Sequence, residues 1–196
     1  MDTLVVMQEK VLSDAELVSE KEEAAIRKAI SNPEAFKPVY EAYFKRIYLF
    51  VLHRLGDKEL SADVTQQVFL KALTNLHRYQ FRGLPFSSWL FRIAVNQCTD
   101  FFRQQKKMRA VVLEEGSIQE LYEDLTADHS WDEWEQKLPA VLEALPEEDL
   151  QIIELRYFEQ RPFKEVSEIL GISESNTKVR TYRILARMKK IFLQQR

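Results

Sequence analysis

Apolar residues recur three and four positions apart along almost the whole chain. Between Phe36 and Val51, for example, Tyr40, Phe44 and Ile47 follow this spacing. The period is typical of amphipathic helices, and the sequence has no alternating strand-like stretches joined by turn dipeptides. The sequence therefore predicts an all-α protein.

Glycine and proline indicate where these helices end. Gly56 followed by Asp57 predicts the end of one helix and the capped start of the next. Gly83 and Pro85 interrupt the helical pattern once more. Pro38 either begins a separate helix or kinks a longer one.

Charge is segregated along the sequence, although the whole chain carries a net charge of only -3. Residues 36–107 carry +7 and residues 108–137 carry -7. Helical spacing also fades after residue 107 and resumes at Trp131. We therefore expect two small helical domains joined by an acidic linker, an arrangement that suits a polyanion held at two places. The expected bounds are 1–107 for the first domain, 108–130 for the linker and 131–196 for the second domain.

The composition argues against an enzyme, a metalloprotein or a membrane protein. The single cysteine, Cys98, and three scattered histidines give no metal-ligand spacing. None of the 4 glycines forms a phosphate-binding loop, and no catalytic motif is found. No apolar run approaches the roughly 18 residues needed to cross a bilayer. We expect no catalytic residues, no metal, no cofactor and a cytoplasmic location, with Cys98 a small buried hydrophobic residue rather than a redox sensor.

Residues 164–190, "KEVSEILGISESNTKVRTYRILARMKK", follow the pattern of a helix-turn-helix. Gly171 permits a tight turn, and Ser173 is placed to cap the second helix. From Ser175 onward there are seven basic residues and no acidic one. The alternative is a solvated basic helix that complements its own dipole, but the complete turn pattern favours DNA in the major groove. The expected core face of the second helix is Thr177, Thr181, Ile184, Met188 and Ile191.

A second motif lies between Phe81 and Lys107. Its predicted core stripe includes Leu90, Ile93, Ala94 and Phe101, while a different stripe mixes aromatic, amide and cationic side chains. Aromatic faces stack on bases, amides read base edges and arginine neutralises phosphate, so this second stripe suits unstacked bases. The alternative is that its tryptophan belongs to the core and its polar members are merely solvated. The stripe consists of Trp89, Arg92, Asn96 and Arg103.

A third motif, "SADVTQQVFLKAL" at residues 61–73, predicts an amphipathic helix. Its apolar side includes Val64, Val68 and Leu73, and taken alone it fits any surface helix. Its polar face consists of Asp63, Gln66, Gln67 and Lys71.

In their order along the chain, the three motifs resemble the extracytoplasmic-function sigma factors of bacterial RNA polymerase. "ADVTQQVFLKAL" is similar to the family's polymerase-binding helix, and "FSSWLFRIAVNQCTDFFR" is similar to its minus-10 reader. "ALPEEDLQIIELRYFEQRPFKEVSEILGIS" followed by "NTKVR" is similar to its minus-35 reader. The resemblance covers nearly the whole chain.

The resemblance implies a promoter-specificity subunit that binds core RNA polymerase and helps to open promoter DNA by capturing unstacked bases. It also implies an anti-sigma factor as a partner, and a loop from Phe81 to Phe86 that forms the base pocket with Asn96 beneath it. The implied polymerase-binding residues are Asp63, Gln66, Gln67 and Phe69. The implied minus-10 residues are Phe81, Arg82, Trp89, Arg92, Asn96 and Arg103. The implied minus-35 residues are Asn176, Lys178, Val179, Arg180, Tyr182, Arg183 and Arg187.

Two other functions fit parts of the sequence. A two-domain transcriptional regulator would bind duplex DNA through the helix-turn-helix without joining the polymerase, usually as a dimer on a palindrome. A pure interaction protein would use its N-terminal helices to sequester a partner. Neither needs the stripe of Trp89, Arg92 and Asn96, so this stripe favours the sigma factor.

Overall fold

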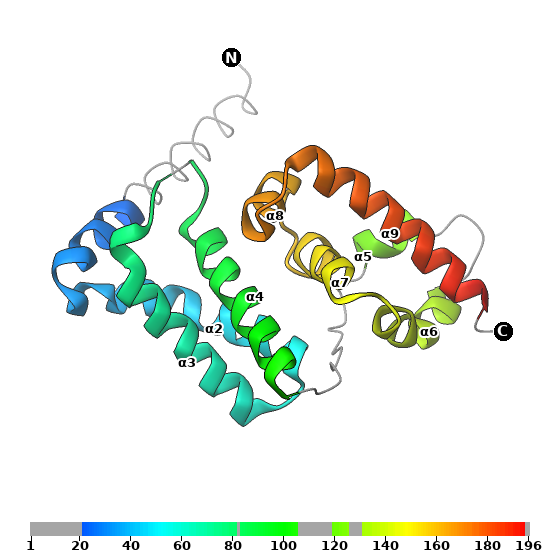
Figure 1. The fold of residues 1–196 in the computed structure, drawn as a ribbon, viewed down its shortest axis with the longest axis horizontal. Coiled ribbons are helices and arrows are strands. Elements are labelled where there is room, and N and C mark those ends of the chain that lie inside the picture. Colours follow the sequence, from blue (N-terminus) through cyan, green and yellow to red (C-terminus); the bar gives the residue numbers. More distant parts are fainter. Residues whose placement is uncertain (1–20, 82, 106–118, 126–130, 195–196) are drawn as a thin grey trace, which may run out of the picture.

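The computed structural model describes residues 21–81, 83–105, 119–125 and 131–194. All regular structure within these ranges is helical, which confirms the all-α prediction. The helices form two groups that lie side by side (Figure 1). The first group contains a helix at residues 21–31, α2 (Lys37–Leu55), α3 (Lys58–Asn75) and α4 (Phe86–Gln105). The second contains α5 (Gln119–Leu125), α6 (Trp131–Glu143), α7 (Glu147–Ile153), α8 (Phe163–Leu170) and α9 (Glu174–Gln194).

Short-range signals set the helix boundaries of the first domain. Gly56 has a φ of 68° and ends α2, because this left-handed conformation costs glycine little. The Asp57 carboxylate then caps α3 by accepting a hydrogen bond of 2.9 Å from the Leu60 amide. Pro38 lies in the first turn of α2, where its missing N–H is not needed, so it begins a separate helix.

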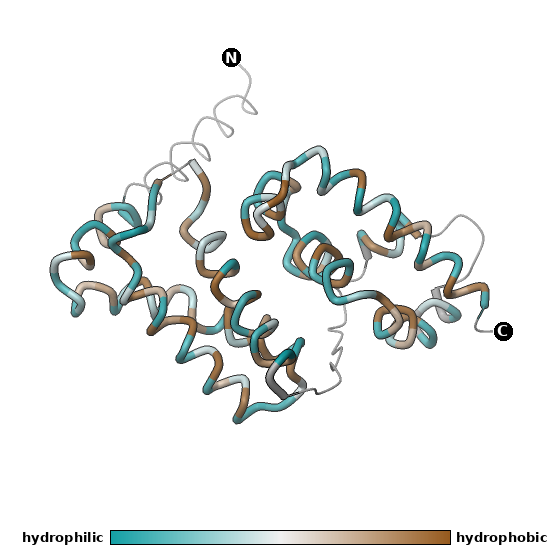
Figure 2. The backbone as a smooth tube through the Cα atoms, viewed as in Figure 1, coloured by the Kyte–Doolittle hydropathy of each residue, from teal (hydrophilic) through white to brown (hydrophobic). Residues whose placement is uncertain are grey.

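The core of the first domain lies between α2, α3 and α4. Ile47, Val51, Val68, Leu90 and Ala94 are each fully buried there. Figure 2 shows hydrophobic and hydrophilic residues alternating along each helix, as expected for helices with one face toward a core. The fully buried residues of α2, α3 and α4 therefore follow the helical spacing seen in the sequence.

The second domain has its own core beneath α9. The Trp134 ring of α6 stacks on the Phe192 ring of α9, with centroids 4.0 Å apart. Leu121 and Leu125 of α5 are also buried in this core. α5 therefore lies inside residues 108–130, which we expected to be a linker. Two leucines four residues apart in an acidic stretch are too few to reveal a helical period, and the linker bounds stay a prediction.

The two domains pack against each other through α4 and α8 (Figure 1). Leu155, Val166 and Ile169 of the second domain belong to the same buried cluster as the core of the first. This contact was not predicted from the sequence, because it joins positions far apart in the chain.

Cys98 is fully buried in α4. Burial raises the pKa of its thiol to about 12, so the thiol stays protonated and unreactive at neutral pH. This confirms Cys98 as a small buried hydrophobic residue.

None of the described helices is long and apolar enough to cross a membrane. Within the same residues, no group of three or more His, Cys, Asp or Glu side chains could hold a metal ion.

Candidate nucleic-acid interface

An aromatic group positions Trp89 at the start of α4. Phe86 is buried, and the Tyr79 ring contacts both the Phe86 ring and the Trp89 ring, with centroid distances of 4.9 and 5.3 Å. Trp89 itself is only partly buried, packing against the core while its other side borders a surface hollow. Trp89 therefore packs against the core as a core residue does, and it also exposes an aromatic surface on which a base could stack.

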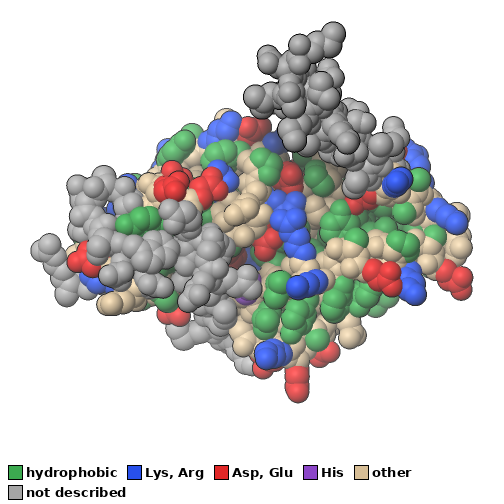
Figure 3. All heavy atoms as spheres, turned by 180° about the vertical axis from the view of Figure 1, so that it is seen from behind, with side chains coloured by type: hydrophobic (Ala, Val, Ile, Leu, Met, Phe, Trp, Pro, Cys, Tyr) green, Lys and Arg blue, Asp and Glu red, His purple; other side chains and the backbone are tan. Residues whose placement is uncertain are grey.

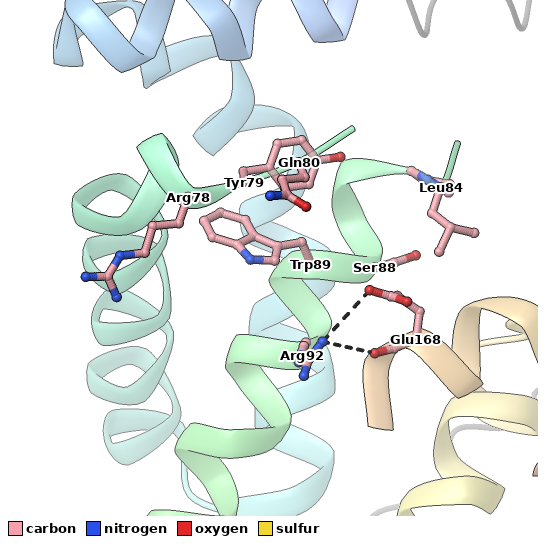
Figure 4. Close-up of a pocket in the computed structure, with 9 residues that line it drawn as sticks. Arg78, Tyr79, Gln80, Leu84, Ser88, Trp89, Arg92 and Glu168 are labelled. Carbon is pink, nitrogen blue, oxygen red and sulfur yellow. Dashed lines mark hydrogen bonds and ion pairs between the residues drawn. The ribbon is translucent and has the colours of Figure 1, made fainter. Parts of the chain in front are cut away.

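We call this concavity the aromatic hollow. Figure 4 shows its side chains, with Trp89 on α4 facing Arg78 and Gln80 from the preceding segment. Arg92 lies at its edge, and its Nη1 is 3.8 Å from a carboxylate oxygen of Glu168 on α8. An aromatic surface beside two arginines can stack a base and hold its phosphate. The hollow is lined by Arg78, Tyr79, Gln80, Leu84, Pro85, Ser88, Trp89, Arg92 and Glu168.

Asn96 does not line the aromatic hollow, contrary to the expectation that it lies beneath the Phe81–Phe86 loop. It is exposed and lines a neighbouring hollow with Lys71 and Asn75 of α3. The reason is geometric: Asn96 follows Trp89 by seven residues, or about 10 Å along a helix. Trp89 and Arg92 border both hollows, so Trp89, Arg92 and Asn96 still form one continuous path.

The other predicted minus-10 residues lie at the ends of this path. Phe81 is 37% exposed, and the guanidinium of Arg27 lies 5.0 Å from its ring centroid. Arg103 is exposed and pairs with Asp100 at 2.9 Å. Arg82 lies outside the described residues.

The four residues predicted to bind polymerase all lie on α3, but one of them is buried. Asp63, Gln66 and Gln67 are exposed, as expected. Phe69 is only 3% exposed, because its ring packs against aromatic rings of the first domain, so it supports the helix and cannot contact a partner directly. The next residue, Leu70, is 62% exposed and was missed by the sequence analysis. A large apolar side chain left outside on an amphipathic helix was the signal that could have found it.

The helix-turn-helix forms as predicted. Gly171 has a φ of 68°, and the Ser173 hydroxyl accepts a hydrogen bond of 3.2 Å from the Asn176 amide at the start of α9. The expected core face is confirmed: Thr177, Thr181, Ile184 and Met188 are buried, and Ile191 is partly buried. On the outer side of the helix, Asn176, Val179, Tyr182 and Arg183 are exposed.

The sequence from Ser175 onward has basic residues and no acidic ones, but the fold places carboxylates beside two of the arginines of α9. Arg180 lies 3.2 Å from Glu148 and 3.3 Å from Asp149, both in the first turn of α7. Arg187 also pairs with Asp149, at 2.5 Å. These carboxylates are about thirty residues away in the sequence, so a scan along α9 cannot reveal them. Arg180 and Arg187 are thus weaker candidates for DNA contact than Arg183.

Lys178 has a local partner. Its ammonium lies 2.6 Å from Glu174, one turn earlier on α9. Because this pair is about half exposed, it is weak and can exchange for a phosphate at little cost. Lys178 therefore stays a predicted minus-35 residue.

Comparisons with known proteins show the family of the chain. A family model for Sigma-70 region 2 matches residues 39–108, and a model for Sigma-70 region 4 matches residues 135–188. The RNA polymerase sigma factor SigV of Bacillus subtilis is 30% identical over 142 residues, which cover 72% of this chain and 81% of SigV. The chain belongs to the RNA polymerase sigma factors. It is of the extracytoplasmic-function group: the ECF RNA polymerase sigma factor SigM of Bacillus subtilis is 28% identical over 79% of this chain and 93% of SigM.

Solved structures share the fold. CnrH, in complex with the cytosolic domain of CnrY, aligns with a TM-score of 0.59 at 19% identity, covering 88% of this chain and 97% of that chain. The sigma factor RpoE, in complex with the anti-sigma factor NepR from Bartonella quintana, aligns with a TM-score of 0.58 at 17% identity, covering 81% of this chain and 96% of that chain. This sigma factor therefore has the family's two helical domains, and it directs transcription initiation at promoters. A regulator that acts on duplex DNA alone is not favoured.

Proposed function

We propose that the first domain of this sigma factor captures unstacked bases of the minus-10 element along α4. The observation that carries the proposal is the aromatic hollow, where Trp89 and Tyr79 offer aromatic surface beside two arginines. Stacking tolerates any base, while the exposed Asn96 amide further along α4 can read a base edge. Holding a flipped base offsets the few kcal/mol lost when it leaves the stack.

The second domain reads the minus-35 element of the duplex through α9. The outer face of α9 near its start carries Asn176, Val179, Tyr182 and Arg183, where a helix-turn-helix delivers side chains to base edges. Arg183 is exposed and forms no ion pair with a described residue, which suits a bidentate contact to guanine. We also propose that the two domains span residues 1–107 and 131–196, and that an acidic linker joins them.

Core polymerase is bound by the exposed face of α3. This face combines Asp63, Gln66 and Gln67 with the apolar Leu70, and the core of the first domain does not use it. The protein acts beside the polymerase in the cytoplasm and catalyses no reaction itself. An anti-sigma factor is a further expected partner, as NepR is for the structural neighbour RpoE.

Replacing Asp63 and Gln66 together with arginine is expected to weaken association with core polymerase on the order of tenfold or more, because reversed charge opposes complementary groups across an interface. Binding of the purified protein to core polymerase, measured by fluorescence anisotropy, checks this. Glu34→Arg, an exposed charge reversal outside α3, controls for most of the change in net charge. Unchanged affinity in the double variant, with its fold intact, would show that α3 is not the polymerase contact.

Asn96→Ala is expected to impair promoter opening more than closed-complex binding. The exposed Asn96 amide can read the edge of a base only after that base has left the stack, so the loss of about 1 kcal/mol or more appears at the open complex. Permanganate reactivity of promoter thymines reports opening, and filter binding reports the closed complex. An equal loss on intact duplex and on a pre-melted bubble would count against a role for Asn96 in opening.

A further inference from the structure

The helix at residues 21–31 packs firmly against the rest of the first domain. Ile26 and Ala29 are buried in the core of that domain, which fixes the position of the helix. Near the start of the helix, the Glu22 carboxylate accepts a hydrogen bond from the Tyr43 hydroxyl of α2. No residue predicted to bind DNA or polymerase belongs to this helix, so its exposed side chains have no function assigned so far.

Arg27 of this helix lies over the ring of Phe81, the first residue of the loop that borders the aromatic hollow. Its guanidinium is 5.0 Å from the ring centroid, a distance at which a cation is attracted to the face of an aromatic ring. The Arg27 side chain is nevertheless 65% exposed. The guanidinium is therefore held in one place by the ring and is still accessible to a ligand.

A row of aromatic rings connects Arg27 to the aromatic hollow. The centroid of the Phe81 ring is 4.8 Å from that of Tyr79, and the Tyr79 centroid is 5.3 Å from that of Trp89. Tyr79, Gln80 and Trp89 all line the hollow. Burial is the main cause that raises the pKa of Tyr79 to about 12, so its hydroxyl stays uncharged at neutral pH and does not repel a phosphate. Arg27 thus lies at the end of the row opposite Trp89, next to the surface proposed to capture a base.

Positive charge alone does not single out Arg27. Figure 3 shows Lys and Arg side chains spread over one face of the molecule rather than gathered in a single patch. Arg27 differs from an ordinary surface cation because it is seated on a ring of the aromatic row. Lys28, the next residue, is also exposed, but it projects about 100° further around the helix.

Glu23 occupies the donors of Arg27 when no DNA is bound. The Arg27 Nε and Nη2 both donate to one carboxylate oxygen of Glu23, at 2.8 and 2.5 Å. The two residues are one helical turn apart, and the Glu23 side chain is 37% exposed, so the pair contributes little to stability. A phosphate oxygen has the same acceptor chemistry as this carboxylate oxygen. A phosphate can therefore replace Glu23 at little cost.

We propose that Arg27 binds a backbone phosphate of the melted minus-10 strand, beside the nucleotide whose base is held in the aromatic hollow, and that Glu23 holds the guanidinium until the phosphate replaces it. This contact rests on the proposed function, because it extends the path of the strand from α4 onto the helix at residues 21–31. A phosphate contact carries no sequence information, so Arg27 adds affinity for the melted strand without selecting its bases.

The test measures binding of reconstituted holoenzyme to a pre-melted promoter across a salt series. Arg27→Gln removes the proposed contact, and Lys28→Gln removes the same charge from the neighbouring residue. We expect Arg27→Gln to weaken binding about fivefold at about 0.1 M salt, and to lower the slope of log affinity against log salt by about 0.7, as one phosphate contact to a single strand does. Lys28→Gln should leave both quantities close to wild type, and Arg27→Lys, which keeps the charge, should retain the wild-type slope.

Glu23→Gln tests the exchange between carboxylate and phosphate. We expect it to tighten binding to the same template about twofold, because it removes an exposed pair that competes for the guanidinium. In the Arg27→Gln background the same substitution should change affinity less, since no guanidinium is left to be released. An equal effect of Glu23→Gln in both backgrounds would show that Glu23 does not act through Arg27, and would overturn this part of the proposal.

Two results would overturn the phosphate contact itself. One is equal affinity and equal salt slope in Arg27→Gln and Lys28→Gln. The other is a loss of affinity in Arg27→Gln with an unchanged salt slope, because Arg27 would then only support Phe81. Trp89→Leu on the same template tests the proposed function separately: wild-type binding by Trp89→Leu would contradict base capture, whereas weak binding by Trp89→Leu with normal binding by Arg27→Gln would contradict only the Arg27 contact.

Discussion

Replacing Trp89 with leucine is expected to weaken binding of the assembled polymerase to a pre-melted promoter by about 5- to 150-fold, because stacking of one base on an aromatic side chain is worth about 1 to 3 kcal/mol. Leucine keeps apolar contact with the core, against which Trp89 packs, but offers no aromatic surface to a base. The effect should appear on the single-stranded part of the promoter, where bases are unstacked.

The Trp89→Leu measurement compares a bubble template with an intact duplex of the same sequence. A promoter fragment recovered by run-off transcription supplies the template, and thermal unfolding shows whether the first domain remains folded. We expect a large loss on the bubble and little change in the contact of α9 with the minus-35 duplex. Equal affinity of Trp89→Leu and wild type for the bubble would show that Trp89 does not contact the DNA and serves only as a core residue.

Replacing Arg183 with alanine is expected to cost about 1 to 3 kcal/mol of promoter binding and to relax preference at one minus-35 position, as the loss of a bidentate base contact does. Arg183 is exposed on α9, whereas Arg187 pairs with Asp149 inside the second domain. Arg187→Ala should therefore cost less than Arg183→Ala. Lys189→Ala should cost least, because Lys189 lies beyond the expected groove contact.

Holoenzyme binding to minus-35 variants across a salt series separates the ways in which Arg183 can act. A phosphate contact would weaken all sequences alike and lower the salt slope by about one unit, while a base contact changes the ranking of sequences. Lys189→Ala and Arg183→Ala could also weaken DNA binding equally, and do so on random DNA as well. In that case α9 binds DNA non-specifically, only because DNA is a polyanion.

The sequence predicts best those features that depend on neighbouring residues. The buried face of α9, the cap at Ser173 and the end of α2 at Gly56 were all predicted, because each follows from helical period or from local backbone chemistry. The exposed polar face of α3 was predicted for the same reason.

Features that depend on distant residues were missed. Asp149 neutralises Arg180 and Arg187 from another helix, so the charge of α9 read alone overstates its attraction for DNA. The burial of Phe69 depends on rings contributed by earlier segments. The contact of α4 with α8 depends on how two domains dock, which no local pattern encodes.

Run-off transcription from genomic fragments, with core polymerase and with or without this protein, tests promoter-specific initiation most directly. The proposed function predicts discrete transcripts that appear only when the protein is present, and that disappear when Trp89→Leu and Arg183→Ala are combined. The same set of transcripts with and without the protein, at concentrations where it binds the polymerase, would contradict its role as a promoter-specificity subunit.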